Sequence, residues 1–359
     1  MGNNTYKPSN KFNFAGLLLI ILGVAGAGCL VSLVYLKINK INPIVYLTIL
    51  LTVGFGAIIG VVANFVIKKF KIRNAGMAML AVLIGALIFT YFKWATYVYW
   101  DNQEILHDGK EDYNLTEEYM ISELPYLGNT LGDLLTSPSE LWSQIKDINE
   151  SGRWSYRASR SSSVPKTPVK GIPLTIVWLV EAAILIGLPM IMASGKAKQP
   201  YSETEDDWLK EYKNVFMFGN YNLNVNKQII LNNPDEIFNI PLFENVPNQN
   251  HVKGTLYHSS DFSECYMTLS SQTYNAKNKK FDSSDVIQYL TLTYPQVDRL
   301  FDYFKMNKPF ASATSYNYQQ PTYQQPVYEQ PSYQQPTYQQ PQQPTQSNSD
   351  YVNPDEFFK

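Results

Sequence analysis

Four apolar runs constrain this chain more than any other feature of its sequence. They cover Ala15–Leu36, Ile44–Ile67, Ala75 to about Tyr99, and Gly171–Ala193. A helix needs about 20 apolar residues to cross the hydrocarbon core of a bilayer, whereas a run of about 10–14 is typical of a helix buried in a soluble core. The sequence therefore predicts a polytopic α-helical membrane protein with four transmembrane helices.

The first run has some features of a signal peptide. Lys7 and Lys11 precede it, and Gly26-Ala27-Gly28-Cys29 resembles a lipoprotein cleavage box. That box requires a branched apolar residue where Gly26 stands, and the run is longer than the roughly 7–15 apolar residues of a cleaved signal. We therefore expect an uncleaved helix, preceded by a cytoplasmic segment over residues 1–14.

Basic residues predict the orientation. Lys and Arg in short loops mark the cytoplasmic side of a membrane protein, whereas long loops follow this rule weakly. The short loop after the second run is therefore cytoplasmic, and so are both termini. Only two cysteines occur, Cys29 and Cys265, which excludes a disulfide framework and, with the acidic outer loop, favours a bacterial inner membrane. The basic residues of the short loop are Lys68, Lys69, Lys71 and Arg73.

Two ionisable residues lie inside the runs. Glu181 is near the middle of the fourth run, and Lys93 is toward the outer end of the third, about one helical turn away in depth. A buried charge is costly unless it is paired or hydrated. Three alternatives follow: a Lys93–Glu181 pair that only locks the bundle, a functional carboxylate that carries a proton or binds a partner helix, or a neutral Glu181 facing lipid or a neighbour.

Other residues in the runs have more ordinary expected uses. Gly56 and Gly60 form a GxxxG pattern, which favours packing within the bundle over pairing in a homo-oligomer. Asn64 is expected at the inner interface. An aromatic cluster near the end of the third run is expected at the outer interface, where rings with polar tips concentrate; it comprises Tyr91, Phe92, Trp94, Tyr97, Tyr99 and Trp100.

The outer loop, residues 101–170, separates its charges. Residues 101–150 hold twelve acidic and two basic side chains, and residues 151–170 hold five basic and no acidic ones. A solvated loop is the favoured interpretation, with self-folding or an acidic face for a partner or cation as alternatives. Ser137, Pro138 and Glu140 form a capping-box pattern that predicts an amphipathic helix near 138–149. Residues 157–165 have the composition of a flexible linker.

Residues 200–308 are expected to form a small α+β cytoplasmic domain. Apolar spacing and turn residues predict its elements. They are a helix over Glu203–Tyr212, strands over His251–His258, Ser263–Tyr274 and Val286–Tyr294, and a helix from Pro295.

The sequence carries no recognisable catalytic or metal-binding motif. His251 and His258 are seven residues apart on one expected strand and so face opposite sides. Cys265 lies in an apolar stripe and is expected in the core. His107 stands alone in the outer loop. We therefore expect no enzyme, no catalytic residue, no cofactor and no metal, and a net charge of -2 argues against nucleic-acid binding.

The C-terminal segment is of low complexity. A YQQP-like repeat fills residues 311–349, where frequent proline favours disorder or polyproline II. An inert spacer, a multivalent array and a phosphorylation target are the alternatives. Residues 350–359 form an acidic-aromatic peptide suited to docking. The candidate partner-binding residues are Tyr318, Tyr323, Tyr328, Tyr333, Tyr338, Tyr351, Phe357 and Phe358.

These features favour a non-enzymatic membrane scaffold or assembly subunit. Its contacts would be the lipid bilayer, an unidentified protein partner held by the cytoplasmic domain and the C-terminal tail, and a second copy of the chain if the small residues pair. The alternative is a small transport or proton-coupled component that uses Glu181. A membrane-facing enzyme ranks below both, because no group of residues in the sequence supports it.

Overall fold

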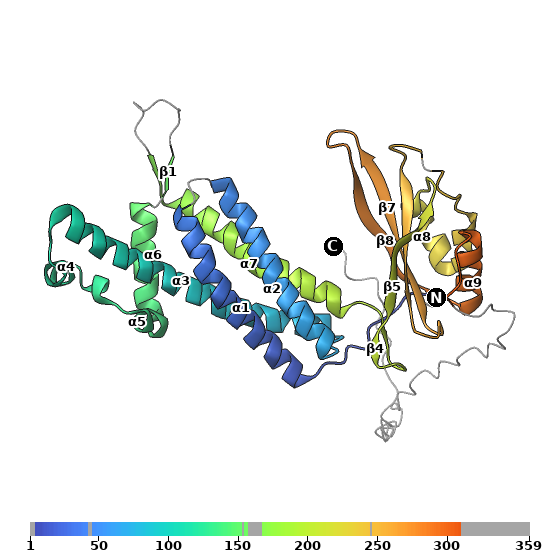
Figure 1. Cartoon of the computed structure of the whole chain (residues 1–359), viewed down its shortest axis with the longest axis horizontal. Coiled ribbons are helices and arrows are strands. Elements are labelled where there is room, and N and C mark those ends of the chain that lie inside the picture. Colours follow the sequence, from blue (N-terminus) through green and yellow to red (C-terminus); the bar gives the residue numbers. More distant parts are fainter. Residues whose placement is uncertain (1–3, 42–44, 153, 157–166, 245, 310–359) are drawn as a thin grey trace, which may run out of the picture. The chain divides into compact units, whose positions relative to one another are not determined.

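The computed structural model describes residues 4–41, 45–152, 154–156, 167–244 and 246–309. The chain divides into two compact units, residues 1–313 and 314–359, and every described residue belongs to the first. The described elements are long apolar helices, a group of short helices, and a four-stranded sheet with helices of its own (Figure 1).

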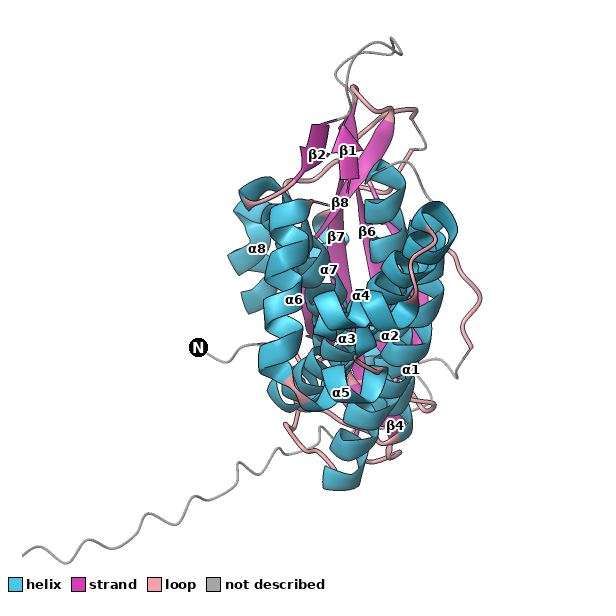
Figure 2. Cartoon of the chain, turned by 90° about the vertical axis from the view of Figure 1, so that its left-hand side faces the viewer, coloured by secondary structure: helices cyan, strands magenta, loops and turns pink. Residues whose placement is uncertain are grey.

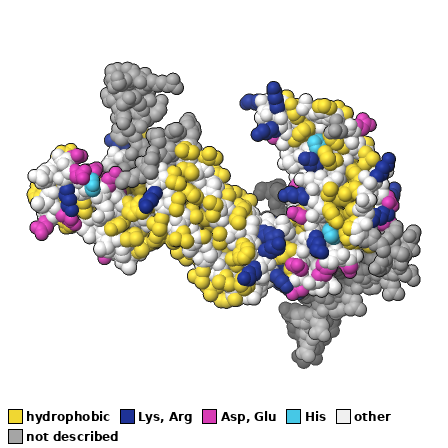
Figure 3. All heavy atoms as spheres, in the orientation of Figure 1, with side chains coloured by type: hydrophobic (Ala, Val, Ile, Leu, Met, Phe, Trp, Pro, Cys, Tyr) yellow, Lys and Arg dark blue, Asp and Glu magenta, His cyan; other side chains and the backbone are white. Residues whose placement is uncertain are grey.

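The described residues contain four helices long and apolar enough to cross a membrane, as predicted. We call α1 (Phe14–Ile41), α2 (Val45–Lys69), α3 (Ala75–Tyr113) and α7 (Ile172–Ala197) the apolar bundle. At most 33 % of the most apolar window of each helix is buried. Hydrophobic side chains therefore cover much of the visible face of the bundle (Figure 3). A soluble bundle turns its apolar stripe inward, so this outward surface indicates a membrane-embedded protein.

Glycines allow the helices of the bundle to approach closely. A Cβ atom added at Gly85 of α3 would lie 2.8 Å from the carbonyl oxygen of Ile21 in α1. Gly56 and Gly60 face α7, where an added Cβ at Gly56 would lie 3.3 Å from the Ile184 carbonyl oxygen. The GxxxG pattern of α2 thus packs two helices of the same chain, which is the favoured of its two expected uses.

Helix α3 continues well past the predicted end of its apolar run. Its 39 residues correspond to about 58 Å, and it ends where Asn114 adopts a left-handed conformation with φ 53°. Leu106 on this extension is buried with Met120 and Leu127. Burial against the following segment therefore stabilises a helix whose sequence has become polar.

Short helices fill most of the predicted outer loop. They are α4 (Glu117–Glu123), η1 (Pro125–Gly128), α5 (Leu131–Thr136) and α6 (Pro138–Ser151). The interpretation as a solvated loop is therefore wrong for this part, which folds on itself around two small apolar clusters. Residues 157–165, the predicted linker, lie outside the described residues, between β1 (Trp154–Tyr156) and its antiparallel partner β2 (Thr167–Val169).

Helix α6 is the predicted amphipathic helix. Leu141, Ile145 and Ile148 are buried, and Trp142 is exposed. The predicted capping box is wrong, because Glu140 Oε1 accepts hydrogen bonds from Gln144 and Asn129. The capping box of this region is at the start of α5, between Thr130 and Asp133.

The sheet of the α+β region has the strand order β5-β6-β7-β8, with each neighbouring pair antiparallel. Figure 2 shows its strands in magenta. Helices α8 (Leu223–Asn232) and α9 (Tyr294–Tyr303) lie on one side of it, with η2 (Pro234–Asn239) (Figure 1). Its core includes Phe216, Leu256, Met267, Leu290 and Phe301. The predicted strand over His251–His258 is confirmed residue for residue, and the other two strands and the last helix are confirmed with shifted ends. The strands are β5 (Lys210–Phe218), β6 (His251–His258), β7 (Cys265–Asn275) and β8 (Lys280–Leu292).

The helix predicted over Glu203–Tyr212 is wrong. The segment forms a tight hairpin of β3 (Tyr201–Ser202) and β4 (Asp207–Trp208), and then enters β5. Ser202 Oγ accepts a hydrogen bond from the Glu205 N–H, as an N-cap would. Asp206 then adopts φ 52°, which turns the chain back. The rings of Tyr201 and Trp208 meet edge to face and join the core of the apolar bundle.

The N-terminal segment adds to the free edge of the sheet. Thr5 forms an antiparallel bridge with Leu290 of β8, Tyr6 N–H donates to Tyr289 O at 2.9 Å, and Thr291 N–H donates to Asn4 O at 2.8 Å. These bonds satisfy backbone groups that an edge strand would leave open to other chains.

We predict that Gly85→Ala destabilises the apolar bundle by about 1–3 kcal/mol, because its methyl group meets the Ile21 carbonyl oxygen and overpacks the α1–α3 contact. Thermal unfolding in mild detergent measures the change. Gly26→Ala is the matched control, because no atom lies within 4 Å of a Cβ added there. Equal stability of the two variants would contradict the close packing.

Candidate functional site

An ion pair lies inside the apolar bundle. Lys93 of α3 donates from Nζ to Glu181 Oε1 of α7. The two side chains are 9 % and 11 % exposed. Each charge would be expensive in an apolar environment without the other, and the pair neutralises both. Of the three alternatives from the sequence, the structure therefore has the paired arrangement.

Side chains of α1 and α2, together with Trp94 of α3, lie near the pair. Lys93 Nζ lies 5.1 Å from the centre of the Tyr35 ring of α1 and 5.7 Å from that of Trp94. Thr52 of α2 donates to the Thr48 carbonyl oxygen at 2.8 Å. Thr52 Oγ1 therefore accepts from Tyr35 OH, 3.1 Å away. All four helices of the bundle thus contribute a side chain to this polar cluster.

The polar cluster extends along α3. Thr90, Lys93 and Thr96 are spaced by three residues, so they share one face of the helix. The Oγ1 atoms of Thr90 and Thr96 are buried and have no hydrogen-bond partner among the described residues. Each hydroxyl can donate one hydrogen bond and accept others. The ion pair is therefore flanked by two hydroxyl groups that remain available for a further contact.

The residues predicted at the membrane interfaces make contacts inside the protein, and their depth in a membrane stays a prediction. Asn64, predicted at the inner interface, has a buried Oδ1 atom with no hydrogen-bond partner among the described residues. Four rings of the aromatic cluster, those of Tyr91, Trp94, Tyr97 and Tyr99, pack on an apolar core shared with α5 and α6. Tyr91 OH, for example, donates to the Leu134 carbonyl oxygen at 3.1 Å. The folded outer segment thus covers part of this aromatic cluster.

Histidines and cysteines offer little chemistry. No group of three or more His, Cys, Asp or Glu side chains suited to a metal ion occurs in the described part of the chain. His258 is stacked 4.1 Å from Phe262, whereas His251 contacts Phe281 at 4.8 Å between ring centres. Cys265 is in the core of the sheet, where burial raises the pKa of its thiol far above the usual range. The side chains of His251, His258 and Cys265 therefore pack against neighbouring residues.

The candidate residues of the tail lie outside the described residues, so their placement stays a prediction. They are Tyr318, Tyr323, Tyr328, Tyr333, Tyr338, Tyr351, Phe357 and Phe358. Sequence reasoning missed Tyr35 and Thr52, which complete the polar cluster. A single tyrosine or threonine within an apolar run is common, and only its position opposite Lys93 singles it out.

Comparison with known proteins returns no match: no family model, no curated protein and no solved structure is similar to this chain.

We predict that Glu181→Gln destabilises the bundle by about 3–5 kcal/mol, because it leaves the Lys93 ammonium buried without a counter-charge. The double change Lys93→Met and Glu181→Met should recover most of this loss, because it removes both charges at similar volume. Unfolding in mixed detergent micelles measures both. Glu150→Gln, at an exposed position outside the bundle, is the control. If the double variant lost as much unfolding free energy as the two single variants together, the unpaired charge would not be the cause of the loss.

We also predict a pH-dependent loss of stability in the sheet. Burial between Tyr212 and Phe262 lowers the pKa of His258, with Lys210 acting in the same direction. The unfolded chain then binds more protons below about pH 6.5, so stability falls as the pH decreases through that value. Hydrogen exchange of β6 and β7 in the full chain, corrected for intrinsic rates, measures it. His258→Phe should abolish this pH dependence of stability, and His251→Phe should retain it. If the pH dependence persists in His258→Phe and disappears in His251→Phe, it arises from a group other than His258.

Proposed function

We propose that the chain is a non-enzymatic integral membrane scaffold or assembly subunit. The observation that carries the proposal is the Lys93–Glu181 pair, because both intramembrane charges are satisfied within one chain. A bundle whose intramembrane charges are paired with each other serves as a membrane anchor. Partner proteins would then bind to the parts of the chain outside the membrane. The α+β domain and the tethered tail supply two such parts.

The proposed orientation places both termini and the α+β domain in the cytoplasm of a bacterial cell. Its support is the basic loop between α2 and α3, which holds four Lys and Arg residues within six positions. Short loops of this kind resist translocation. The helices α4 to α6 then lie on the outer side.

We expect the C-terminal peptide to hold a partner. Full-length protein, tagged within residues 157–165 so that the tail stays free, would be purified in mild detergent and analysed by native gel and mass spectrometry. A stoichiometric partner should be lost on deletion of residues 350–359 or in the Phe357→Ser, Phe358→Ser variant, because the docking aromatics are removed. Deletion of residues 311–349, which keeps the peptide, is the control. A partner that survives removal of the peptide would contradict this role.

A proton-coupled component is the second candidate, and one observation favours it. The hydroxyls of Thr90 and Thr96, which have no hydrogen-bond partner in the described part of the chain, lie one turn before and one turn after Lys93 on the same face of α3. A proton path would need donors and acceptors at such positions. The Lys93→Met, Glu181→Met variant separates the two candidates. A scaffold keeps its partner in this variant, whereas a proton-coupled component loses proton flux when it is reconstituted in vesicles that contain a pH-sensitive dye.

A further inference from the structure

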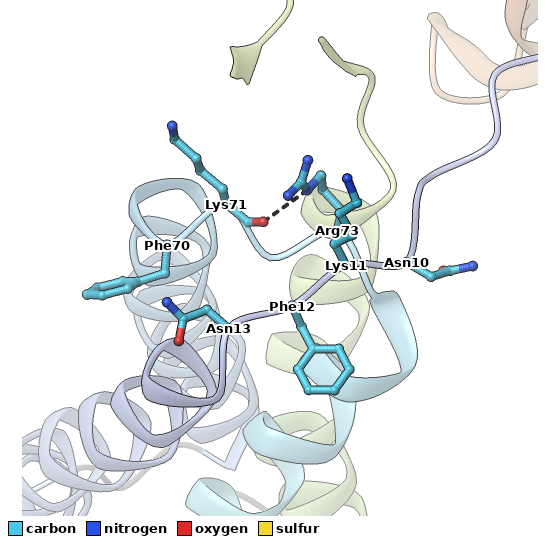
Figure 4. A pocket seen from close by; sticks show the side chains of 7 residues that line it. All are labelled: Asn10, Lys11, Phe12, Asn13, Phe70, Lys71 and Arg73. Carbon is cyan, nitrogen blue, oxygen red and sulfur yellow. Dashed lines mark hydrogen bonds between the residues drawn. The ribbon is translucent and has the colours of Figure 1, made fainter. Parts of the chain in front are cut away.

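A basic pocket lies at the end of the apolar bundle where α1 begins and α2 ends. Its volume is about 540 Å³, which is within the roughly 300–1,000 Å³ usual for ligand sites. The pocket combines three cationic side chains with two phenylalanines and two asparagines (Figure 4). The residues that line it are Asn10, Lys11, Phe12, Asn13, Phe70, Lys71 and Arg73.

Backbone hydrogen bonds hold the two walls of the basic pocket together. Arg73 N–H donates to the Lys11 carbonyl oxygen at 2.9 Å, and Asn74 Nδ2 donates to the Asn10 carbonyl oxygen at 3.2 Å. Helix α2 ends in a Schellman motif, in which Ile72 N–H donates to Ile67 O at 3.1 Å. The segment before α1 is therefore fastened to the loop after α2, and the pocket is preformed.

Lys71 occupies a backbone position that favours glycine. It follows the C-cap of α2 and has φ 53°, in the left-handed region. Lysine there strains the backbone, whereas glycine would not, and such strain is typical of positions where the side chain has a use. At this position the side chain forms an ion pair: Lys71 Nζ lies 2.5 Å from Asp206 Oδ2.

The cations of the basic pocket already bind carboxylate oxygens. Glu203 accepts from Arg73 at 2.5 Å and from Lys11 at 3.1 Å, so three cations share two carboxylates. Hydrogen bonds from Lys71 and from Tyr201 hold the pKa of the Asp206 carboxyl below its usual range. Asp206 is 70 % exposed and Glu203 is 45 % exposed. The pairs of Lys11 and Lys71 are exposed and therefore weak, so a second anion can compete for these two lysines, whereas the side chain of Arg73 is only 11 % exposed.

The surroundings point to a lipid as the source of that anion. Phe14 and Phe12 are 77 % and 47 % exposed, and the apolar outer surface of α1 begins directly beyond them. Lys and Arg side chains gather at this end of the hydrophobic surface (Figure 3). In Figure 4 the Phe12 ring points toward the helices, whereas the three cationic groups point away from them. At a bilayer interface, apolar rings lie toward the hydrocarbon and charged side chains reach toward water. The side chains of the basic pocket have this arrangement.

We propose that the basic pocket binds the phosphate headgroup of an anionic phospholipid, through Lys11, Lys71 and Arg73, with the acyl chains along α1. Basic pockets at helix ends on the cytoplasmic side suit such headgroups. The inference rests on the membrane embedding that the four apolar helices indicate, and it is independent of the proposed scaffold function. Glu203 and Asp206 act as competitors for the same cations.

Native mass spectrometry of the full chain in mild detergent tests this proposal, with phosphatidylglycerol as the probe and phosphatidylcholine as the neutral comparison. The wild type should retain phosphatidylglycerol selectively. Lys11→Gln with Lys71→Gln should weaken retention about tenfold or more, because each cation near the surface contributes about 1 kcal/mol. Lys69→Gln with Lys198→Gln is the matched control, because it removes two exposed charges from the same end of the bundle and none from the pocket.

Two further variants keep the test decisive. Lys71→Gly relieves the left-handed strain, so it should fold at least as well as the wild type and still lose lipid. Glu203→Gln removes a competitor and should strengthen retention. Unchanged retention in the pocket variants, or an equal loss in the control, would overturn the proposal. Displacement of the lipid by an equal concentration of inorganic phosphate would also overturn it, because free phosphate would then be the preferred ligand.

Discussion

The structure depends on an apolar surface that faces outward from four helices. A helix satisfies its own backbone hydrogen bonds, so it tolerates hydrocarbon on every side, and this is what α1, α2, α3 and α7 require. In such an environment the hydrophobic effect does not drive helices together. Close packing at Gly56, Gly60 and Gly85 and one ion pair supply the contacts instead.

Charges in the chain are arranged around this bundle at three levels. Inside it, Lys93 and Glu181 neutralise each other. At the end where α1 begins, Lys11, Lys71 and Arg73 meet the carboxylates of the β3–β4 hairpin. Beyond the other end, the acidic segment folds into α4 to α6 around apolar side chains, so its charges lie on helices. A chain embedded in a membrane needs each of these solutions, because an unpaired charge is tolerated only in water.

The N-terminal segment connects the two folded parts of the chain. Residues 4–6 extend the sheet at β8, and residues 10 and 11 bond to the loop after α2. The hairpin of β3 and β4 adds a second connection, because Trp208 Nε1 donates to the Lys68 carbonyl oxygen at 3.0 Å. The basic pocket lies between these contacts, so a lipid headgroup bound there would touch the elements that join bundle and sheet.

Sequence by itself determined the features that depend on local pattern. Four apolar runs predicted four helices, alternation predicted β7, and the stripe after Pro295 predicted α9, because each signal lies within one element. Only the tertiary structure decided that Tyr35 and Thr52 complete the polar cluster, that α3 extends to Tyr113, and that residues 203–212 form a turn and a strand. Those outcomes depend on partners far along the chain: Leu106 on Met120 and Leu127, and Tyr201 and Trp208 on the bundle. A serine that caps one turn looks the same in sequence whether a helix or a hairpin follows, and long-range burial makes the choice.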